Sequence, residues 1–266
     1  MQSPTKALEW TFDTVADTYA KLRPGYVPEL YQALFDYMPI DRSSRVVEVG
    51  SGGGQATGPI LATGCQLTAV EYGTRFSGLL REKFRNYPGF SVITGRFEDT
   101  PFEAASCDLV FSASAFHWIP EQIGYEKVYA MLRPGGAFAR FANYPNRDKG
   151  DPWLSRAIDE VYDQYYYKYY GRPREKRPEF TEEMAKEKAM IAARYGFTEI
   201  QYRLFHRQRV ISASDYAGLL GTYSDHIAMD ADIRRAFFAA IEDVVHQHGG
   251  TITLYDTIDL QLARKG

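Results

Sequence analysis

The order of apolar segments along the chain predicts a sheet built from strands that alternate with helices. Between residues 45 and 142, short apolar runs typical of buried strands alternate with segments whose apolar residues recur at helical spacing. Strands are predicted at 45–49, 66–70, 90–93, 107–112 and 136–142, and helices at 55–62, 74–86 and 121–131, with a short turn around 115–118. This alternation is typical of βαβ units in a parallel sheet. Ligands bind such sheets at the carboxyl ends of the strands, so the following loops should hold the chemistry.

The segments outside this alternation are predicted to be mostly helical. Residues 7–22 carry apolar side chains at helical spacing, and Pro28 opens a second helix that runs to about Tyr37. Further helices are predicted at 152–170, 180–195, 213–221 and 231–248, and long strands at 198–211 and 251–263. In a plain version of this fold the last two strands form a hairpin. We therefore expect the stretches at 151–180 and 212–250 to be additions that cap the strand ends.

Composition indicates an ordinary folded protein. The 266 residues are 45% hydrophobic and 24% charged with a net charge of −3, which excludes disorder and disfavours coating of nucleic acid or membrane by bulk charge. Two cysteines, Cys65 and Cys107, are too few for a disulfide scaffold and have no zinc-ligand spacing. The start of the chain lacks the apolar core of a signal peptide, and no segment approaches the roughly 20 apolar residues that span a bilayer. We expect a soluble, cytoplasmic protein without a metal site.

The strongest chemical signal is the segment Val46–Gly54, VVEVGSGGG. A buried strand here enters a tight glycine turn that opens a helix, and glycine allows both the unusual dihedrals and close approach of a ligand. A dinucleotide fingerprint has its third glycine five residues after the first, where this chain has Gln55. Glu48 would also repel a pyrophosphate but suits a cationic amine. A nicotinamide site is therefore disfavoured, and a turn without any ligand is the structural alternative.

Glu71 adds a second signal, because it ends the second predicted strand 21 positions after Gly50. An acid about 20 residues after such a turn commonly accepts hydrogen bonds from ribose hydroxyls. A glutamate at a strand end can also be merely solvated. Together with the glycine turn, however, Glu71 favours a nucleoside ligand.

Five segments of the chain carry a resemblance to a known family. In chain order they are VVEVGSGGG, AVEYG, GRFEDTPF, SCDLVFSASAFHW and LRPGGAF. They resemble class I S-adenosylmethionine-dependent methyltransferases, and more narrowly the methyltransferase type 11 group. The resemblance covers about residues 40–142. It implies an α/β fold: a Rossmann-like, seven-stranded, mostly parallel sheet with helices on both faces and a helical cap. The implied regions are a helical lid at 1–40, a cofactor-binding core at 41–150, and at 151–266 the last two strands with the cap insertions. The opening FDTVADTYAKLRPGY and His117-Trp118 are similar to trans-aconitate-type small-molecule enzymes.

Carried over by position, the resemblance implies how S-adenosylmethionine is held. The glycine turn approaches the methionine part, Glu48 helps hold its amine, and Tyr72 lies against adenine. The implied cofactor-binding residues are Glu48, Gly50, Ser51, Gly52, Gly54, Glu71, Tyr72, Arg96, Phe97, Glu98, Ser112 and Ala113. The family usually has an acid at the position of Arg96, and arginine cannot accept a hydrogen bond from the adenine amino group. Either Glu98 or the backbone around Phe97 then reads the adenine edge.

Methyl transfer from a sulfonium is an in-line displacement in which the cofactor carries the chemistry and the protein mainly aligns the reactants. A base is needed only if the acceptor loses a proton. His117 is the candidate base; alternatively, His117 and Trp118 simply form the pocket wall. Tyr19 is predicted to border the methyl-transfer pocket as a catalytic residue, or else to complete an apolar helix face. Tyr26 and Tyr166, with Trp118, are predicted to contact substrate.

These observations predict a methyltransferase that acts on a small organic molecule, with a carboxylate suggested by the resemblance alone. The alternatives are an RNA methyltransferase and a non-catalytic protein that binds S-adenosylmethionine. The RNA alternative rests on a basic stretch beside a tyrosine cluster, Lys168, Arg172, Arg174, Lys176 and Arg177. Nearby glutamates dilute this charge, so a solvated loop is favoured. The scattered His206, His226, His246 and His248 are expected to be solvated or internally hydrogen-bonded.

Overall fold

The computed structural model describes residues 9–147, 151–174 and 178–266, and it divides into two compact units. The larger unit comprises Pro24–Asn143, Phe180–Phe205 and Ile258–Gly266. The smaller unit comprises the chain before Pro24 together with Tyr144–Glu179 and His206–Thr257. The chain crosses between the two units within three long strands and also before Pro24 and before Phe180.

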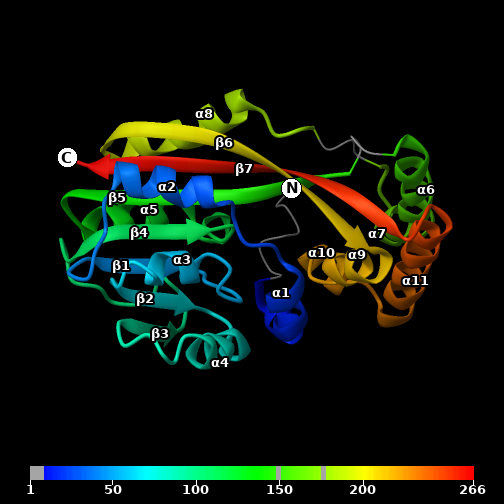
Figure 1. Ribbon diagram of the computed structural model, residues 1–266, viewed down its shortest axis with the longest axis horizontal. Coiled ribbons are helices and arrows are strands. Elements are labelled where there is room, and N and C mark those ends of the chain that lie inside the picture. The colour runs from blue at the N-terminus through cyan, green and yellow to red at the C-terminus, as the bar shows by residue number, and fades with distance from the viewer. Residues whose placement is uncertain (1–8, 148–150, 175–177) are drawn as a thin grey trace. The chain divides into compact units, whose positions relative to one another are not determined.

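A seven-stranded sheet confirms the Rossmann-like fold (Figure 1). Its strands are β1 (Arg45–Val49), β2 (Gln66–Glu71), β3 (Phe90–Thr94), β4 (Cys107–Ala113), β5 (Leu132–Asn146), β6 (Phe197–Ser212) and β7 (Thr251–Lys265). They lie in the order β3-β2-β1-β4-β5-β7-β6, and the pairs from β3 to β5 are parallel. The arrow of β7 points opposite to those of β5 and β6. Strand order reverses at β1, which pairs with both β2 and β4, and ligands bind at such a switch point.

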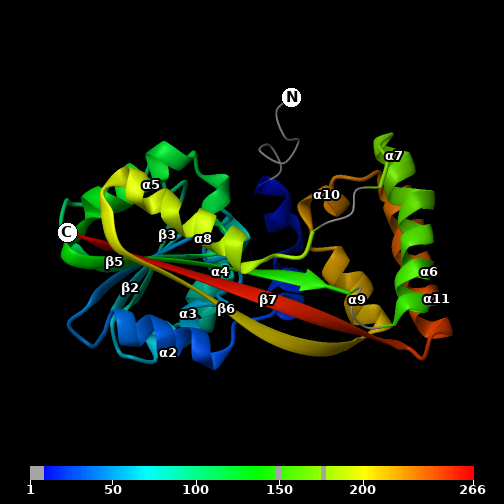
Figure 2. The same ribbon diagram turned by 90° about the horizontal axis from the view of Figure 1, so that it is seen from above.

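Helices cover both faces of the sheet in the larger unit (Figure 2). One face carries α2 (Pro28–Tyr37), α3 (Thr57–Leu61) and α4 (Thr74–Lys83), and the other carries α5 (Glu121–Met131) and α8 (Glu182–Met190). Short 3-10 helices are at Phe116–Trp118 and Ile191–Tyr195. Because side chains alternate along a strand, Val46 packs in the core under α2–α4, whereas Val47 packs in the core under α5.

The smaller unit is mostly helical, as the sequence predicts. It contains a 3-10 helix at Glu9–Val15, α1 (Ala16–Leu22), α6 (Pro152–Tyr162), a π-helical segment at Asp163–Tyr167, α7 (Lys168–Tyr170), α9 (Ala213–Leu220), α10 (Ser224–Ile227) and α11 (Ala231–Gln247). Its core joins Leu154 and Ile158 of α6 to Phe237 and Ile241 of α11. Within the described part of the chain, no helix has the length and apolar character needed to cross a bilayer.

Several of the predicted helices need correction. The one at 180–195 is α8 followed by the 3-10 helix Ile191–Tyr195. The helix predicted at 7–22 begins as a 3-10 helix, and its residues 7 and 8 lie outside the described part. The continuous helix predicted at 152–170 is interrupted by the π-helical segment in its tyrosine-rich part. The helix predicted at 55–62 shortens to Thr57–Leu61, because the glycine turn continues through Gln55 and Ala56. α10 was not predicted, since four residues are too few to show a helical period.

Candidate functional site

The glycine turn after β1 has the strained geometry that its sequence predicts. Gly50, Gly52 and Gly54 adopt φ values of +71°, +51° and +72°, a region that residues with a side chain rarely occupy. A Cβ on Gly50 would lie 2.4 Å from the Cβ of Ala115, and one on Gly54 would lie 2.7 Å from Cε2 of Phe84. Glycine is therefore required at Gly50 and Gly54 for space as well as for dihedral freedom.

Glu71 connects the end of β2 to this turn. Its Oε2 accepts a hydrogen bond from the backbone N–H of Gly52 at 2.7 Å, and its Oε1 accepts one from that of Gly73 at 2.8 Å. The residue is only 7% exposed, so its carboxylate is held in one position at the carboxyl end of β2. The carboxylate therefore lies where the sequence predicts the ribose hydroxyls to bind.

Glu48 places a buried carboxyl group beside the turn. Its side chain is fully buried, and its Oε2 accepts a hydrogen bond from the Thr57 hydroxyl at 2.6 Å. Its Oε1 has no hydrogen-bond partner among the described residues. Burial raises the pKa of Glu48 to about 7, and the bond from Thr57 opposes that rise. A buried acceptor without a partner is costly, and it marks a place where a bound cation would be stabilised.

Lys83, at the end of α4, hydrogen-bonds to the glycine turn. The sequence did not predict this contact. Lys83 Nζ donates to the carbonyl oxygens of Gly53 at 2.8 Å and Gly54 at 3.1 Å. Burial lowers the pKa of Lys83, whereas the charge of Glu48 opposes that decrease. No local signal could have found this contact, because Lys83 is 29 residues from Gly54 in the chain.

On the adenine side of the predicted site, the guanidinium of Arg96 lies 4.7 Å from the ring centre of Tyr72. Tyr72 is 45% exposed, so the pair forms an accessible flat platform beyond the end of β2. Phe97 is buried, and the carbonyl oxygen of Glu98 accepts a hydrogen bond from Lys127 Nζ at 2.9 Å. Arg96 thus supports an aromatic face rather than acting as the usual hydrogen-bond acceptor.

The end of β4 is fastened to its neighbours. Ser112 is buried, and its hydroxyl donates to the carbonyl oxygen of Val49 at 2.8 Å, joining β4 to β1. Ala113, the last residue of β4, is half-buried. Ser114 has a φ of +56°, and non-glycine residues held in this region often mark functional sites. Its hydroxyl lies 2.9 Å from that of Tyr26, which places Tyr26 at the same end of the sheet.

His117 lies in the 3-10 helix that follows β4, with its ring centre 5.0 Å from that of Trp118. Desolvation and the positive charges of Lys188 and Arg140 lower the pKa of His117 to about 4. The residue is nonetheless exposed to solvent at one side of this surrounding. Both causes favour the neutral imidazole, which can accept a proton at neutral pH.

Two predicted site residues belong to the smaller unit. The ring of Tyr19 lies 5.0 Å from the guanidinium of Arg23, which contacts Tyr223 on the other side at 4.3 Å and donates to the Thr222 hydroxyl. Tyr166 is buried, and its hydroxyl donates to Asp225 at 2.7 Å. Tyr19 and Tyr166 therefore have internal partners here, and their part in methyl transfer stays a prediction.

The basic stretch is engaged inside the smaller unit. Arg174 forms ion pairs with Asp159 and Asp163, and Arg172 donates to the Tyr166 hydroxyl. Lys176 and Arg177 lie outside the described residues. These contacts favour a structural use of Arg172 and Arg174 over nucleic-acid binding.

Three of the scattered histidines are internally hydrogen-bonded, which confirms that expectation for them. His206 lies 3.5 Å from the Thr257 hydroxyl. His226 is buried between Asp225 at 2.7 Å and the Tyr162 hydroxyl at 3.0 Å. His248 bonds to the carbonyl oxygen of Val244 at 2.8 Å. Among the residues that the structure describes, no group of three or more His, Cys, Asp or Glu side chains could hold a metal ion.

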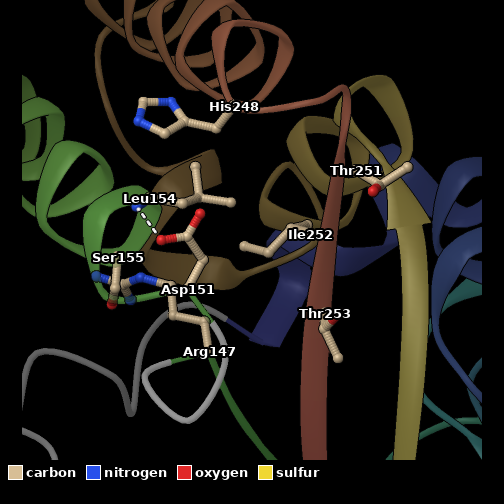
Figure 3. Close-up of a pocket in the computed structure, with 8 residues that line it drawn as sticks. All are labelled: Arg147, Asp151, Leu154, Ser155, His248, Thr251, Ile252 and Thr253. Atoms are coloured by element: carbon tan, nitrogen blue, oxygen red, sulfur yellow. Dashed lines mark hydrogen bonds between the residues drawn. The ribbon is translucent and has the colours of Figure 1, made fainter.

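A cavity of about 200 Å³ lies in the smaller unit (Figure 3). Its walls come from Arg147, Asp151, Leu154, Ser155, His248, Thr251, Ile252 and Thr253. The carboxylate of Asp151 accepts hydrogen bonds from the first backbone N–H groups of α6, so it serves as the cap of that helix. The cavity is smaller than usual ligand pockets, of about 300–1,000 Å³, and contains none of the predicted site residues, so we do not assign the cofactor to it.

Known proteins resemble this chain in sequence and in fold. Residues 47–139 match the family model of the methyltransferase domain. An uncharacterized methyltransferase of Schizosaccharomyces pombe is 26% identical over 236 residues, covering 88% of this chain and 87% of the relative. A malonyl-[acyl-carrier protein] O-methyltransferase of Enterobacter lignolyticus is 32% identical over 131 residues, about half of each chain. A solved structure of a proposed type II methyltransferase from Anaeromyxobacter dehalogenans has a TM-score of 0.61 at 22% identity, covering 91% of this chain and 97% of the other.

The sheet topology defines an α/β protein of the Rossmann-like type, with the glycine turn and the two acids at the carboxyl ends of β1 and β2. Residues 47–139 carry the methyltransferase domain, and the protein is a class I S-adenosylmethionine-dependent methyltransferase. The narrower likeness to trans-aconitate-type enzymes stays a prediction.

Proposed function

We propose that this enzyme methylates a small, acidic organic molecule at the carboxyl ends of β1 and β4. The observation that carries the proposal is Glu48, a buried carboxyl with an unpaired oxygen beside the glycine turn. That oxygen fits an ammonium group, and the bare backbone of the turn fits the close approach of the methionine part. Glu71 supplies acceptors for ribose hydroxyls, and Tyr72 with Arg96 supplies a face for adenine.

When bound, the cofactor supplies an activated methyl group on its sulfonium. The residues of this chain would hold and orient it: Glu71 and Lys83 both hydrogen-bond to the glycine turn, and Ser112 joins β4 to β1. His117, in the first turn after β4, holds a neutral imidazole next to the place where an acceptor would lie. It would accept the proton of an acceptor that must lose one.

The charges around His117 favour an acidic acceptor. Arg140 of β5 and Lys188 of α8 both act on His117, and Arg140 donates to the backbone carbonyl oxygen of Lys188 at 3.3 Å. The buried Asp259 faces the same two cations, whose charges oppose the rise that burial causes in its pKa. A carboxylate would be attracted to such a site. The similarity to a malonyl-[acyl-carrier protein] O-methyltransferase, which covers half of the chain, supports the same class of acceptor.

A labelled-methyl assay tests this function. The protein is incubated with S-adenosylmethionine carrying a labelled methyl group and a panel of small mono- and dicarboxylic acids, beside the corresponding amides. We expect label in product from at least one free acid and none from its amide. Transfer to RNA but to no acid would contradict the acceptor class. Tight cofactor binding without transfer to any acceptor would instead favour a non-catalytic binding protein.

A further inference from the structure

Asn143 carries a buried amide oxygen that the fold leaves without a partner. The residue lies in β5 and is half-buried, but its Oδ1 is shielded from solvent and has no hydrogen-bond partner among the described residues. A buried acceptor that stays unpaired destabilises the folded protein, and leucine would fill a similar volume without this cost. The oxygen therefore calls for an explanation, and a ligand that donates a hydrogen bond to it would supply one.

The strand register places Asn143 at the carboxyl end of the sheet. β4 ends at Ala113, which lies opposite Phe141 of β5, so Asn143 is two residues past the last paired position of β4. Ser114 leaves β4 with a φ of +56°, and its backbone N–H donates to the carbonyl oxygen of Phe141 at 2.8 Å. Asn143 thus extends past the end of β4 on the neighbouring strand, beside the turn at Ser114.

Side-chain alternation indicates which face of the sheet Asn143 occupies. Residues two apart on a strand point to the same side, so Asn143 shares a face with Phe141, whose side chain packs in the core under α2. The ring of Phe141 lies 4.7 Å from that of Tyr26, and the Tyr26 hydroxyl lies 2.9 Å from that of Ser114. Asn143 follows Phe141 toward the carboxyl end of β5, on the face where Tyr26 and Ser114 bring their hydroxyls together.

The chemistry of the amide oxygen limits what can bind to it. An amide oxygen accepts hydrogen bonds and donates none, so the group that faces it must carry an O–H or an N–H. An ionised carboxylate also only accepts, so the acid group of the acceptor cannot satisfy Asn143. The proposed function places the acceptor at the carboxyl ends of β1 and β4, past which Asn143 extends. An acceptor that satisfies this oxygen therefore needs a second polar group beside its acid group.

We propose that Asn143 Oδ1 accepts a hydrogen bond from a hydroxyl of the methyl acceptor, so that the acceptor is a hydroxy acid. This inference rests on the proposed function and deepens it, because it adds a hydroxyl to the acid group. The hydroxyl serves recognition, and the methyl group is transferred to another atom of the acceptor. Asn143 is then a specificity-determining residue for the acceptor, and cofactor affinity does not depend on it.

The experiment uses matched pairs of substrates in the labelled-methyl assay, each pair being a hydroxy acid and the same acid without its hydroxyl. Wild-type kcat/KM should be about tenfold to a hundredfold higher for the hydroxy acid, because the other acid leaves the amide oxygen unpaired. Asn143→Leu should lower kcat/KM for the hydroxy acid by that factor and change it less than about twofold for the other acid. Asn143→Asp keeps an acceptor oxygen and should keep the preference.

Two controls accompany these rates. Asn86→Leu changes an exposed asparagine in the turn after α4 and should leave the preference for the hydroxy acid as in the wild type. Thermal unfolding without ligand shows that the variants fold. Asn143→Leu should unfold at the wild-type temperature or above it, because it removes an unpaired buried oxygen.

Equal kcat/KM of the wild type for both acids of every pair would overturn the inference, and so would an unchanged preference in Asn143→Leu. Transfer to hydroxy acids alone, in wild type and variant alike, would also overturn it, because the hydroxyl would then be the methylated group. Failure of the wild type to methylate any acid would overturn the proposed function, and this inference with it.

Discussion

Glu71 accepts a hydrogen bond from the backbone N–H of Gly52 at 2.7 Å, so the end of β2 and the glycine turn after β1 are held as one piece. The acid that the sequence suggests for ribose binding therefore also shapes the turn that approaches the methionine part. Loss of its charge should affect both halves of the cofactor site together.

Glu71→Gln should weaken S-adenosylmethionine binding about tenfold or more. The amide oxygen of glutamine is a weaker acceptor than a carboxylate, and its NH2 group would face a backbone N–H that now donates to Glu71. The free energy of unfolding should fall by about 1–3 kcal/mol for the same reason. Calorimetric titration and denaturant unfolding measure the two effects. Unchanged affinity in a variant with lowered stability would mean that Glu71 serves the turn alone.

Glu48 should make cofactor affinity depend on pH. Its pKa is raised to about 7, so below pH 7 the protonated carboxyl loses its attraction for the ammonium group, and affinity should fall by up to about tenfold per pH unit. Above about pH 8 the free amine loses its own proton and affinity should decline again. Titrations from pH 5.5 to 9 should give a maximum near neutrality.

Glu48→Gln is the control for this pH dependence. It should bind S-adenosylmethionine more weakly than the wild type and without the decrease on the acid side. The raised pKa also means that the ionised carboxyl is disfavoured in the fold, so ligand-free wild type should lose stability as pH rises from about 4.5 to 7. A wild-type affinity that stays constant between pH 5.5 and 7.5 would rule out Glu48 as the partner of the amine.

Arg96→Ala should weaken cofactor binding about two- to fivefold, because the guanidinium no longer supports the ring of Tyr72. Arg85→Ala is a suitable control, since Arg85 is an exposed arginine that forms an ion pair with Glu82, three residues earlier in the chain. Both variants should have near wild-type stability, as exposed charged pairs contribute little. Tighter binding by Arg96→Ala would mean that the arginine blocks the adenine face.

His117→Ala should lower turnover on the best acid of the panel at least about tenfold while leaving cofactor affinity unchanged. The pKa of His117 is lowered to about 4, so wild-type turnover should not decrease through protonation of this residue until pH falls toward that value. Steady-state rates from pH 4.5 to 8 at saturating cofactor measure both points. Equal turnover in the variant would assign His117 to the pocket wall.

The sheet could be predicted from sequence because buried parallel strands give strong apolar runs, and all seven predicted strands are present. β5 is longer than predicted, since its first residues form an irregular register against β4 around Gly135, whose φ of +76° resembles a turn. The π-helical segment Asp163–Tyr167 could not be predicted from helical spacing, because five residues are too few to distinguish a π-helical period from an α-helical one.

The candidate site could be predicted only where it follows a local motif. Gly50 and Gly54 can be predicted from the glycine turn itself, and Glu71 can be predicted from its spacing after that turn. Lys83 carries none, because its contact with the turn depends on how α4 packs beside β1. The contact of Arg96 with the ring of Tyr72 could not be predicted either, because it depends on how the loops after β2 and β3 fold.

Calorimetric titration of the purified protein with S-adenosylmethionine and, separately, with NAD tests the central claim most directly. The geometry of Glu48 beside the glycine turn predicts micromolar binding of S-adenosylmethionine and no binding of NAD, because a buried carboxyl attracts an ammonium group and repels a pyrophosphate. Binding of NAD, or the absence of binding by S-adenosylmethionine, would contradict the account.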